Sequence, residues 1–347
     1  LLHRNTQQYV QSLADYLLNL FVWMVASVIP TGYLLSAFSQ LNNPLAWGSV
    51  LVVFALLQAI IIRKWADKSS FFLLNGITES FSAIGNTFKQ TSILEKIIFI
   101  VLFIGVAATT LINGYVLITA YPNEWDSMTG HLVKCAYYLQ NGNMNRLQGT
   151  TWTVDFYPNS LPTLQLFFYH VFGEKGFKVI HYVAYWVFVI SSYKVTLQLF
   201  KQCKIALFIG LLAALLPTAL IQTTMTETDL VFSAYLGCIV YFLLSFALKP
   251  TPWNATLAAL MMGIWMSHKV TFILVLPPVF LLVVLIIWHT KAFLTLKNRV
   301  LIVAVALISI SIYVIPNGYI ANVKEVGELK IGSLSAPKEV MHWHGIE

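Results

Sequence analysis

Two acidic residues, Glu124 and Asp126, lie two positions apart directly after a long apolar stretch. This stretch, residues 97–120, contains 24 residues without a charge, enough to cross a bilayer as a helix. Carboxylates at the end of such a span lie where water, lipid headgroups and membrane-anchored substrates meet. They could act as a general base on an acceptor hydroxyl or amine, or hold a divalent cation against a phosphate. Two solvated loop acids would give the same pattern.

A second pair of acids, Glu227 and Asp229, falls in a very short loop between two apolar stretches. Acids held at the membrane surface beside packed helices are costly and often functional. The alternative is a helix N-terminus, with Thr226 or Thr228 as the cap and the acids in the first turn. Asp229 could serve both purposes.

His268 and Lys269 interrupt another long apolar stretch. We expect them at a tight turn between two helices, where the lysine could bind a phosphate as a point charge. The alternative is a lysine that extends its side chain from the end of a span to the headgroups. Asp155, further along the loop that begins with Glu124, could cap a helix or line that loop.

The composition places these residues in a helical membrane protein. Of the 347 residues, 58% are hydrophobic and 10% are charged, against about 25% charged in soluble domains. The apolar runs are too long for β-barrel strands, which predicts helical spans. The net charge of +7 fits cytoplasmic loops, and no basic patch interleaved with aromatic residues indicates nucleic-acid binding. Three scattered cysteines give neither a disulfide framework nor metal-ligand spacing.

We predict nine transmembrane helices. Their ranges are 16–38, 45–62, 97–120, 179–199, 205–222, 230–248, 253–268, 270–288 and 300–316. The short apolar segment 161–172 decides the topology. If it lies in the interface, the basic loops before and after it share one side of the membrane, as the positive-inside rule requires. We therefore predict an interfacial helix at this segment.

This topology gathers most acids on the outer face. Ten of the fourteen acidic residues then face outward: Glu124, Asp126, Asp155, Glu174, Glu227, Asp229, Glu325, Glu328, Glu339 and Glu347. The loop 121–178 is the longest between spans, and residues 127–140 within it carry apolar side chains at helical spacing. That spacing predicts an amphipathic helix on the membrane surface, with His131 and Lys134 interrupting or bordering its apolar face. The apolar residues are Met128, Leu132, Cys135, Ala136 and Leu139.

Three parts are expected along the chain. Residues 1–96 hold two N-terminal spans and a cytoplasmic amphipathic loop. Residues 97–316 form the transmembrane core with the outer loop 121–178. Residues 317–347 begin an outer-face segment that we expect to continue beyond the given sequence.

The run PNEWDSMTGHLVK, residues 122–134, resembles the WDS-x-x-YHL stretch of GT-C class membrane glycosyltransferases. The resemblance is to the group of protein O-mannosyltransferases and the lipid A aminoarabinose transferase, which is like glycosyltransferase family 39. Four later segments resemble parts of this group in the same order: FYPNSLPTLQLFFYHVFG, IQTTMTETDL, GIWMSHKVTFILVLPP and NGYIANVKEVGELKIG. Gly130 stands where an aromatic residue is usual, Ser267 and His268 replace a Gly-Thr pair, and two additional spans precede the core.

The resemblance implies an all-α, GT-C-like fold in a bacterial inner membrane. It implies inverting transfer of a sugar from a polyprenyl-phosphate carrier to an acceptor on the outer face. Asp126 matches the catalytic base, with Glu124 as its neighbour or alternative, and Lys269 matches a turn that holds the carrier phosphate. The other residues expected to bind donor or substrate are His268, Asp229, Glu227, His131, Lys134, Arg146 and Asp155. A divalent cation, if the enzyme uses one, would be held by Glu124, Asp126 and Asp229.

Two other function classes stay open. A transporter or flippase for a lipid or small solute would place charges deep in the spans, whereas the predicted span interiors are nearly uncharged. A non-catalytic subunit of a membrane complex would use loop 121–178 as a docking surface. For the transferase, the acceptor could be a protein, a lipid or a glycan.

Overall fold

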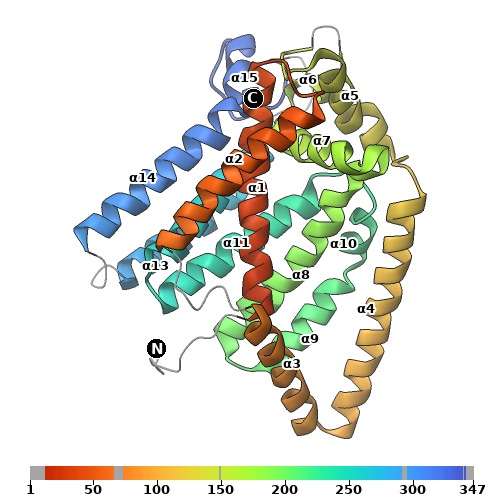
Figure 1. Cartoon of the computed structure of the whole chain (residues 1–347), viewed down its shortest axis with the longest axis vertical. Coiled ribbons are helices and arrows are strands. Elements are labelled where there is room, and N and C mark those ends of the chain that lie inside the picture. The colour runs from red at the N-terminus through yellow and green to blue at the C-terminus, as the bar shows by residue number, and fades with distance from the viewer. Residues whose placement is uncertain (1–11, 66–72, 148–149, 291–294, 339, 341–347) are drawn as a thin grey trace.

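The computed structural model describes residues 12–65, 73–147, 150–290, 295–338 and 340. Within these ranges every regular element is a helix and no strand occurs. Figure 1 shows long helices packed beside one another, with short helices gathered at one end of the bundle. The chain is a helical, multi-pass membrane protein, as its composition predicts.

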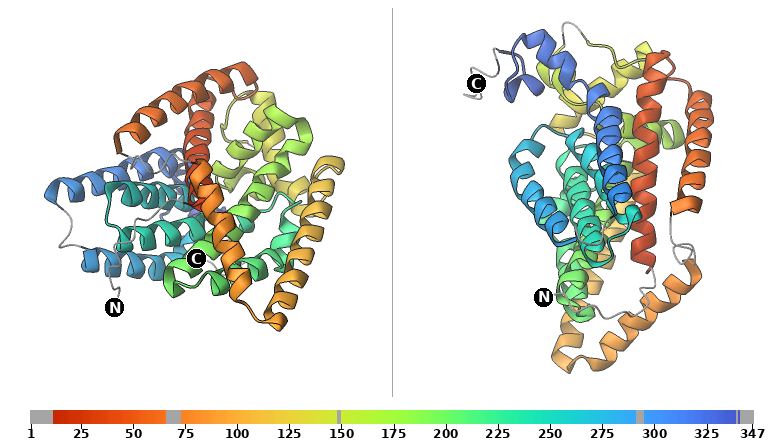
Figure 2. Two further views of the ribbon diagram at one scale, coloured as in Figure 1. Left: turned by 60° about the horizontal axis from the view of Figure 1, so that its bottom comes forward. Right: turned by 90° about the vertical axis from the view of Figure 1, so that its left-hand side faces the viewer.

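The long helices run between the two ends of the bundle, and the chain reverses direction from one to the next except from α8 to α11, where two shorter helices, α9 and α10, bring it back (Figures 1 and 2). In chain order they are α1 (Leu13–Ala37), α2 (Pro44–Trp65), α4 (Ile93–Thr119), α8 (Val179–Phe200), α11 (Asp229–Leu248), α12 (Pro252–Met266), α13 (Phe272–Thr290) and α14 (Leu296–Tyr313). Shorter elements connect them: α3 (Leu73–Gln90), η2 (Ser127–His131), α5 (Leu132–Asn141), α6 (Trp152–Phe156), α7 (Ser160–Phe172), η3 (Gly173–Lys178), α9 (Cys203–Ala214), α10 (Pro217–Gln222), η5 (Ile315–Asn317), α15 (Tyr319–Val326) and η6 (Gly332–Leu334).

Seven helical stretches of the described residues are long and apolar enough to cross a membrane. The predicted count of nine is not confirmed, because two predicted spans differ. The predicted span 205–222 is two helices, α9 and α10, separated just before Pro217. The ring of Pro217 opens α10 but could not continue α9 without a clash and a lost hydrogen bond. The predicted span 253–268 is α12, whose 15 residues are fewer than the roughly 20 that a straight crossing needs.

The apolar segment predicted to lie in the interface forms α7. In Figure 1, α7 runs across the ends of the long helices before the chain turns through η3 into α8. One of the seven stretches that could cross a membrane is residues 160–200, which runs from α7 through η3 to the end of α8. The turn folds tightly onto α7 at Gly176, where a Cβ atom would lie 2.1 Å from the carbonyl oxygen of Phe168. Only glycine fits such a close backbone approach.

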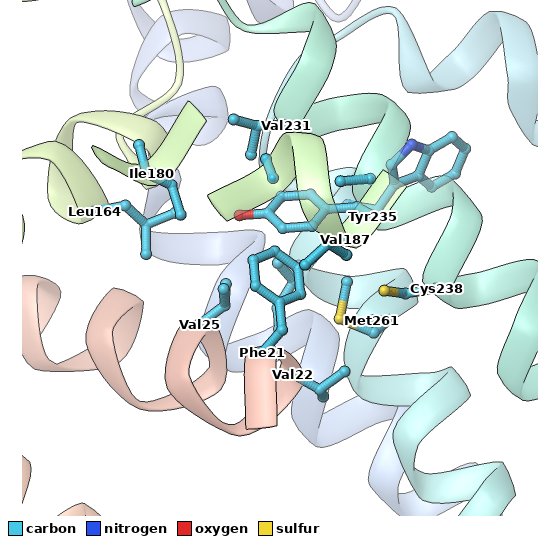
Figure 3. Packing of buried hydrophobic residues seen from close by; sticks show 14 of the residues in the cluster. Phe21, Val22, Val25, Leu164, Ile180, Val187, Val231, Tyr235, Cys238 and Met261 are labelled. Carbon is cyan, nitrogen blue, oxygen red and sulfur yellow. The ribbon is translucent and has the colours of Figure 1, made fainter. Parts of the chain in front are cut away.

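The core lies where α1, α7, α8, α11 and α12 meet. Figure 3 shows Phe21 and Val25 of α1 close to Tyr235 of α11 and Met261 of α12. By contrast, α2, α4, α13 and α14 keep most of the residues in their apolar windows exposed. Such exposed apolar helices suit contact with lipid, because their backbone groups bond within the helix and their apolar side chains can face the lipid tails.

The C-terminal segment packs on the loop that follows α4. Val326, Ala336 and Val340 form a small buried cluster with Phe156 of α6. The side-chain amide of Asn322 donates hydrogen bonds of 2.7 Å to the carbonyl oxygens of Phe156 and Leu334. These contacts fix α15 above the end of the bundle at which α5, α6 and α7 lie (Figure 1).

Candidate functional site

Three segments that are far apart in sequence meet at one end of the bundle, and we call this region the acidic end. They are residues 120–131 after α4, residues 223–229 before α11, and residues 267–271 between α12 and α13. Each carries one of the motifs singled out from the sequence. Their meeting follows from the alternating direction of the helices, which returns every second loop to the same end.

Glu124 ties the first segment to the second. Its carboxylate accepts hydrogen bonds from the backbone N–H of Thr226 and from the hydroxyl of Ser127. The hydroxyls of Ser127 and Thr226 also bond to each other, and both residues are buried. Because its oxygens are engaged by these donors and by the N–H of Asn123, Glu124 serves as a connection between loops.

Asp126 lies two residues further and has a different environment. Its side chain is exposed and makes no helix-capping hydrogen bond, and it has no ion pair within the part of the chain that the structure describes. Its charge nevertheless acts on the pKa of His131, Tyr157 and Glu227, so the carboxylate lies close to all three. Of the two predicted acids, Asp126 is the one accessible to a substrate.

The segment after Asp126 is a π-helix, η2, which continues into α5. A π-helix fits one more residue into its turn than an α-helix and is rare outside functional sites. Met128 and Ala136, expected on the apolar face, are exposed, and the buried positions recur at Ser127, His131, Lys134 and Tyr138. His131 and Lys134, predicted to interrupt or border that face, are both buried.

Lys269 and Asp229 form an ion pair across the acidic end. The side chains are 32% and 59% exposed, so a ligand can reach both. His268 is buried beneath them, with its ring edge against Tyr235 at a centroid distance of 5.2 Å. Its Nε2 lies 3.0 Å from the carbonyl oxygen of Thr228; because a carbonyl only accepts, this nitrogen carries the hydrogen.

Burial and crowding of charge shift several pKa values at the acidic end. The pKa of Glu227 is raised, first by desolvation and then by the carboxylates of Asp126, Asp229 and Glu124. Burial lowers the pKa of His131 and of His268 to about 4 each, although nearby carboxylates oppose the shift. At neutral pH the histidines are therefore uncharged, and the exposed positive charge of the site comes from Lys269.

The remaining predicted residues form a separate cluster under α15. Arg146 pairs with Asp155 at 2.7 Å, stacks on the ring of Phe156 and donates to the carbonyl oxygen of Ala321. This ion pair lines a cavity of about 40 Å³ between the loop and α15. Arg146 and Asp155 thus hold the C-terminal segment, and among the described residues neither forms an ion pair or hydrogen bond with Asp126.

Lys134 lies between the two clusters. Its ammonium donates to the carbonyl oxygen of Tyr157, and the residue is 2% exposed. Desolvation lowers its pKa to about 7, against the opposing effect of Asp155. The ring of Tyr157 lies 5.5 Å from that of His131. Lys134 is therefore bonded to the backbone of Tyr157, the residue whose ring contacts His131 at the acidic end.

Sequence reasoning missed three residues that build the acidic end, Ser127, Tyr157 and Lys178, and considered Thr226 only as a helix cap. Hydroxyl residues and a tyrosine carry no signal in a loop, because their role depends on partners distant in sequence. Lys178 did carry one, since it is a charge placed at the start of a long apolar stretch. Its ammonium donates hydrogen bonds to backbone carbonyl oxygens at the end of α4.

Among the described residues, no three or more His, Cys, Asp or Glu side chains are arranged to hold a metal ion. Comparisons with protein-family models, with curated proteins and with solved structures find no match for this chain. Its function must therefore be argued from the geometry of the acidic end.

Proposed function

We propose that this protein is an inverting, GT-C-type glycosyltransferase that takes a sugar from a polyprenyl-phosphate carrier at its acidic end. We further propose that this end faces outward from a bacterial inner membrane. The observation that carries the proposal is that the acidic end holds an exposed carboxylate, Asp126, with no bond among the described residues, and an accessible cation, Lys269. A base and a phosphate-binding charge are what transfer from a phosphate-linked sugar requires.

The proposed reaction gives each of three residues a task. Asp126 removes the proton from the acceptor hydroxyl or amine while the oxygen or nitrogen of the acceptor attacks the anomeric carbon. The bond from that carbon to the phosphate oxygen breaks, and its electron pair leaves with the carrier phosphate. Lys269 stabilises the departing charge after exchanging Asp229 for the phosphate. Asp229, thus released, can accept a hydrogen bond from the acceptor. No step requires a metal ion.

The test is turnover by the purified protein in lipid nanodiscs, with a panel of polyprenyl-phosphate sugars and candidate acceptors. Loss of a general base typically costs 10²- to 10⁴-fold in rate, so we expect Asp126→Asn to lower turnover by about 1,000-fold and leave the protein folded. Glu174→Gln is the matched control, because Glu174 is an exposed acid of the same loop. Full activity of Asp126→Asn would remove the base assignment.

A transporter or flippase is the second candidate, favoured by one observation. Lys194 of α8 and Asp15 of α1 form a buried ion pair of 2.7 Å inside the helix bundle, and charges within spans often mark transport paths. The two functions differ in a flux assay with proteoliposomes. Transport through the bundle predicts a solute flux that Asp126→Asn keeps, whereas the transferase predicts no flux and loss of turnover in Asp126→Asn.

A further inference from the structure

Lys178 is a buried cation at the acidic end for which the proposed reaction has no task. It is the last residue of η3 and only 1% exposed. Its ammonium donates hydrogen bonds of 3.1 Å to the carbonyl oxygen of Val116 and 2.7 Å to that of Ala120. Because no ligand can reach so buried a group, Lys178 cannot bind substrate and must act through its neighbours.

The two acceptor carbonyls belong to the C-terminal end of α4. The last carbonyls of a helix carry its partial negative charge, so a cation is favoured there; the Val116 carbonyl also accepts the N–H of Ala120 at 3.0 Å. Ala120 already has extended backbone angles, φ −96° and ψ 146°. Lys178 therefore holds α4 at the residue where the chain leaves the helix and turns toward the acids.

A short path leads from this anchor to the site. Residues 121–123 separate Ala120 from Glu124, and the carboxylate of Glu124 lies close enough to act on the Lys178 ammonium. Glu124 in turn is bonded to Thr226, at the start of the segment that carries Asp229. Lys178 at one end and Thr226 at the other thus fix the short segment from which Asp126 projects.

We propose that Lys178 is a positioning residue: together with Glu124 it sets the placement of Asp126 opposite the Lys269–Asp229 pair. The geometric part of this proposal stands on the contacts above, and its catalytic consequence rests on the proposed function. Gly176 supports the arrangement, since the tight turn that it permits brings Lys178 back to α4.

The test compares three variants. Lys178→Met removes the ammonium, Lys178→Arg keeps a cationic donor, and Lys175→Met is the matched control. Lys175 is on the same turn, and its ammonium lies 5.4 Å from the ring of Tyr121, on the same short segment. Among the described residues it makes no hydrogen bond to the end of α4. Spin labels are attached to cysteines at the exposed positions Thr129 and Leu274, and double electron–electron resonance then reports the distance between η2 and α13. Cys203→Ser removes the one native cysteine among the described residues that is not buried.

We expect Lys178→Met to shift and broaden this distance distribution, Lys178→Arg to restore most of it, and Lys175→Met to leave it unchanged. An unchanged distribution in Lys178→Met would overturn the proposal. Should Lys178→Met fail to fold, Glu124→Gln removes the other anchor from a partly exposed position and must broaden the distribution in the same way.

Turnover adds the readout that separates positioning from mere stability. A misplaced base loses rate at the chemical step, where a shift of about 1 Å can cost about 100-fold. We expect Lys178→Met to lower kcat by about that factor with little change in the KM for the donor, and Lys178→Arg to recover it. A raised KM with unchanged kcat would contradict positioning of the base. The distance measurement needs no substrate, so absence of turnover in the unaltered protein would count against the proposed function alone.

Discussion

At the scale of the residue, the acidic side chains at the acidic end differ in role because their neighbours differ. Glu124 is bonded to Ser127 and Thr226 and is not free to take a proton from a substrate. Asp126 is exposed and unbonded within the described residues. Glu227 accepts a 3.0 Å hydrogen bond from Gln222, and desolvation together with the surrounding carboxylates raises its pKa. The structure therefore separates acids that the sequence could only group.

The buried histidines make the folded state sensitive to acid. The pKa of His131 and of His268 is about 4 in the folded protein, against an ordinary value of 6.5. Between these values the unfolded chain binds more protons than the folded one, so stability falls as the pH is lowered from about 6.5 to about 4. The unfolding temperature in detergent should decrease over this range.

Two substitutions check the origin of this pH dependence. His268→Gln removes one of the buried titrating groups and should make the decrease shallower. His289→Gln, at an exposed position in the last turn of α13, should follow the unaltered protein. Equal slopes for His268→Gln and the unaltered protein would show that other groups control acid stability.

At the scale of the element, η2 determines which side chains face the acidic end. Along η2 and α5 the buried side chains include those of Ser127, His131 and Lys134, while Met128 is exposed. The additional residue in the π-helical turn sets the rotation of α5 relative to Glu124 and Asp126. Local geometry of this kind is stable only where tertiary contacts compensate for it.

Deletion of Thr129 tests the role of the π-helix. Thr129 is exposed and bonds only to the carbonyl oxygen of Trp125 four residues earlier. Its removal restores α-helical spacing and rotates Glu124 and Asp126 by about 100° relative to α5. We expect helix content by circular dichroism to be unchanged and turnover to be lost, whereas Thr129→Ala should keep activity. Retained turnover in the deletion would mean that the π-helix is not needed.

At the scale of the whole molecule, one buried polar network joins three helices at the end opposite the acids. Asp15 of α1 pairs with Lys194 of α8 and accepts a hydrogen bond from Tyr241 of α11. Lys194 also donates to Ser12, the N-cap of α1, at 3.2 Å. The side chains of the ion pair are at most 4% exposed, so each charge depends on the other for its solvation.

Breaking this ion pair should destabilise the bundle strongly. Removal of one partner leaves a buried charge alone, which typically costs about 3–5 kcal/mol, so Asp15→Asn or Lys194→Met should lower the free energy of unfolding by about that amount. The double variant should recover much of the loss, because no uncompensated charge remains. Lys204→Met, which breaks the exposed pair with Glu95, should change little. A double variant as unstable as the sum of the single ones would argue against charge compensation.

The sequence by itself determined the class of the protein and the ends at which its charges lie. Long uncharged runs leave no alternative to helices in a bilayer, since backbone groups there must bond within their own segment. Helix boundaries such as those of α4 and α11 also follow from local signals, and the alternation of helices placed Glu124, Asp229 and Lys269 at one end.

Only the tertiary structure decided which of these residues meet and which are free. Glu124 is bonded because Thr226, about a hundred residues later, presents its N–H to it, and no periodicity encodes such a contact. The additional residue in η2 and the two-part helix α9–α10 arise where packing outweighs regular spacing. Arg146 and Asp155 pair under α15 instead of joining the acids, because the C-terminal segment folds back onto the loop. These outcomes depend on contacts between distant segments, which one sequence with local rules does not specify.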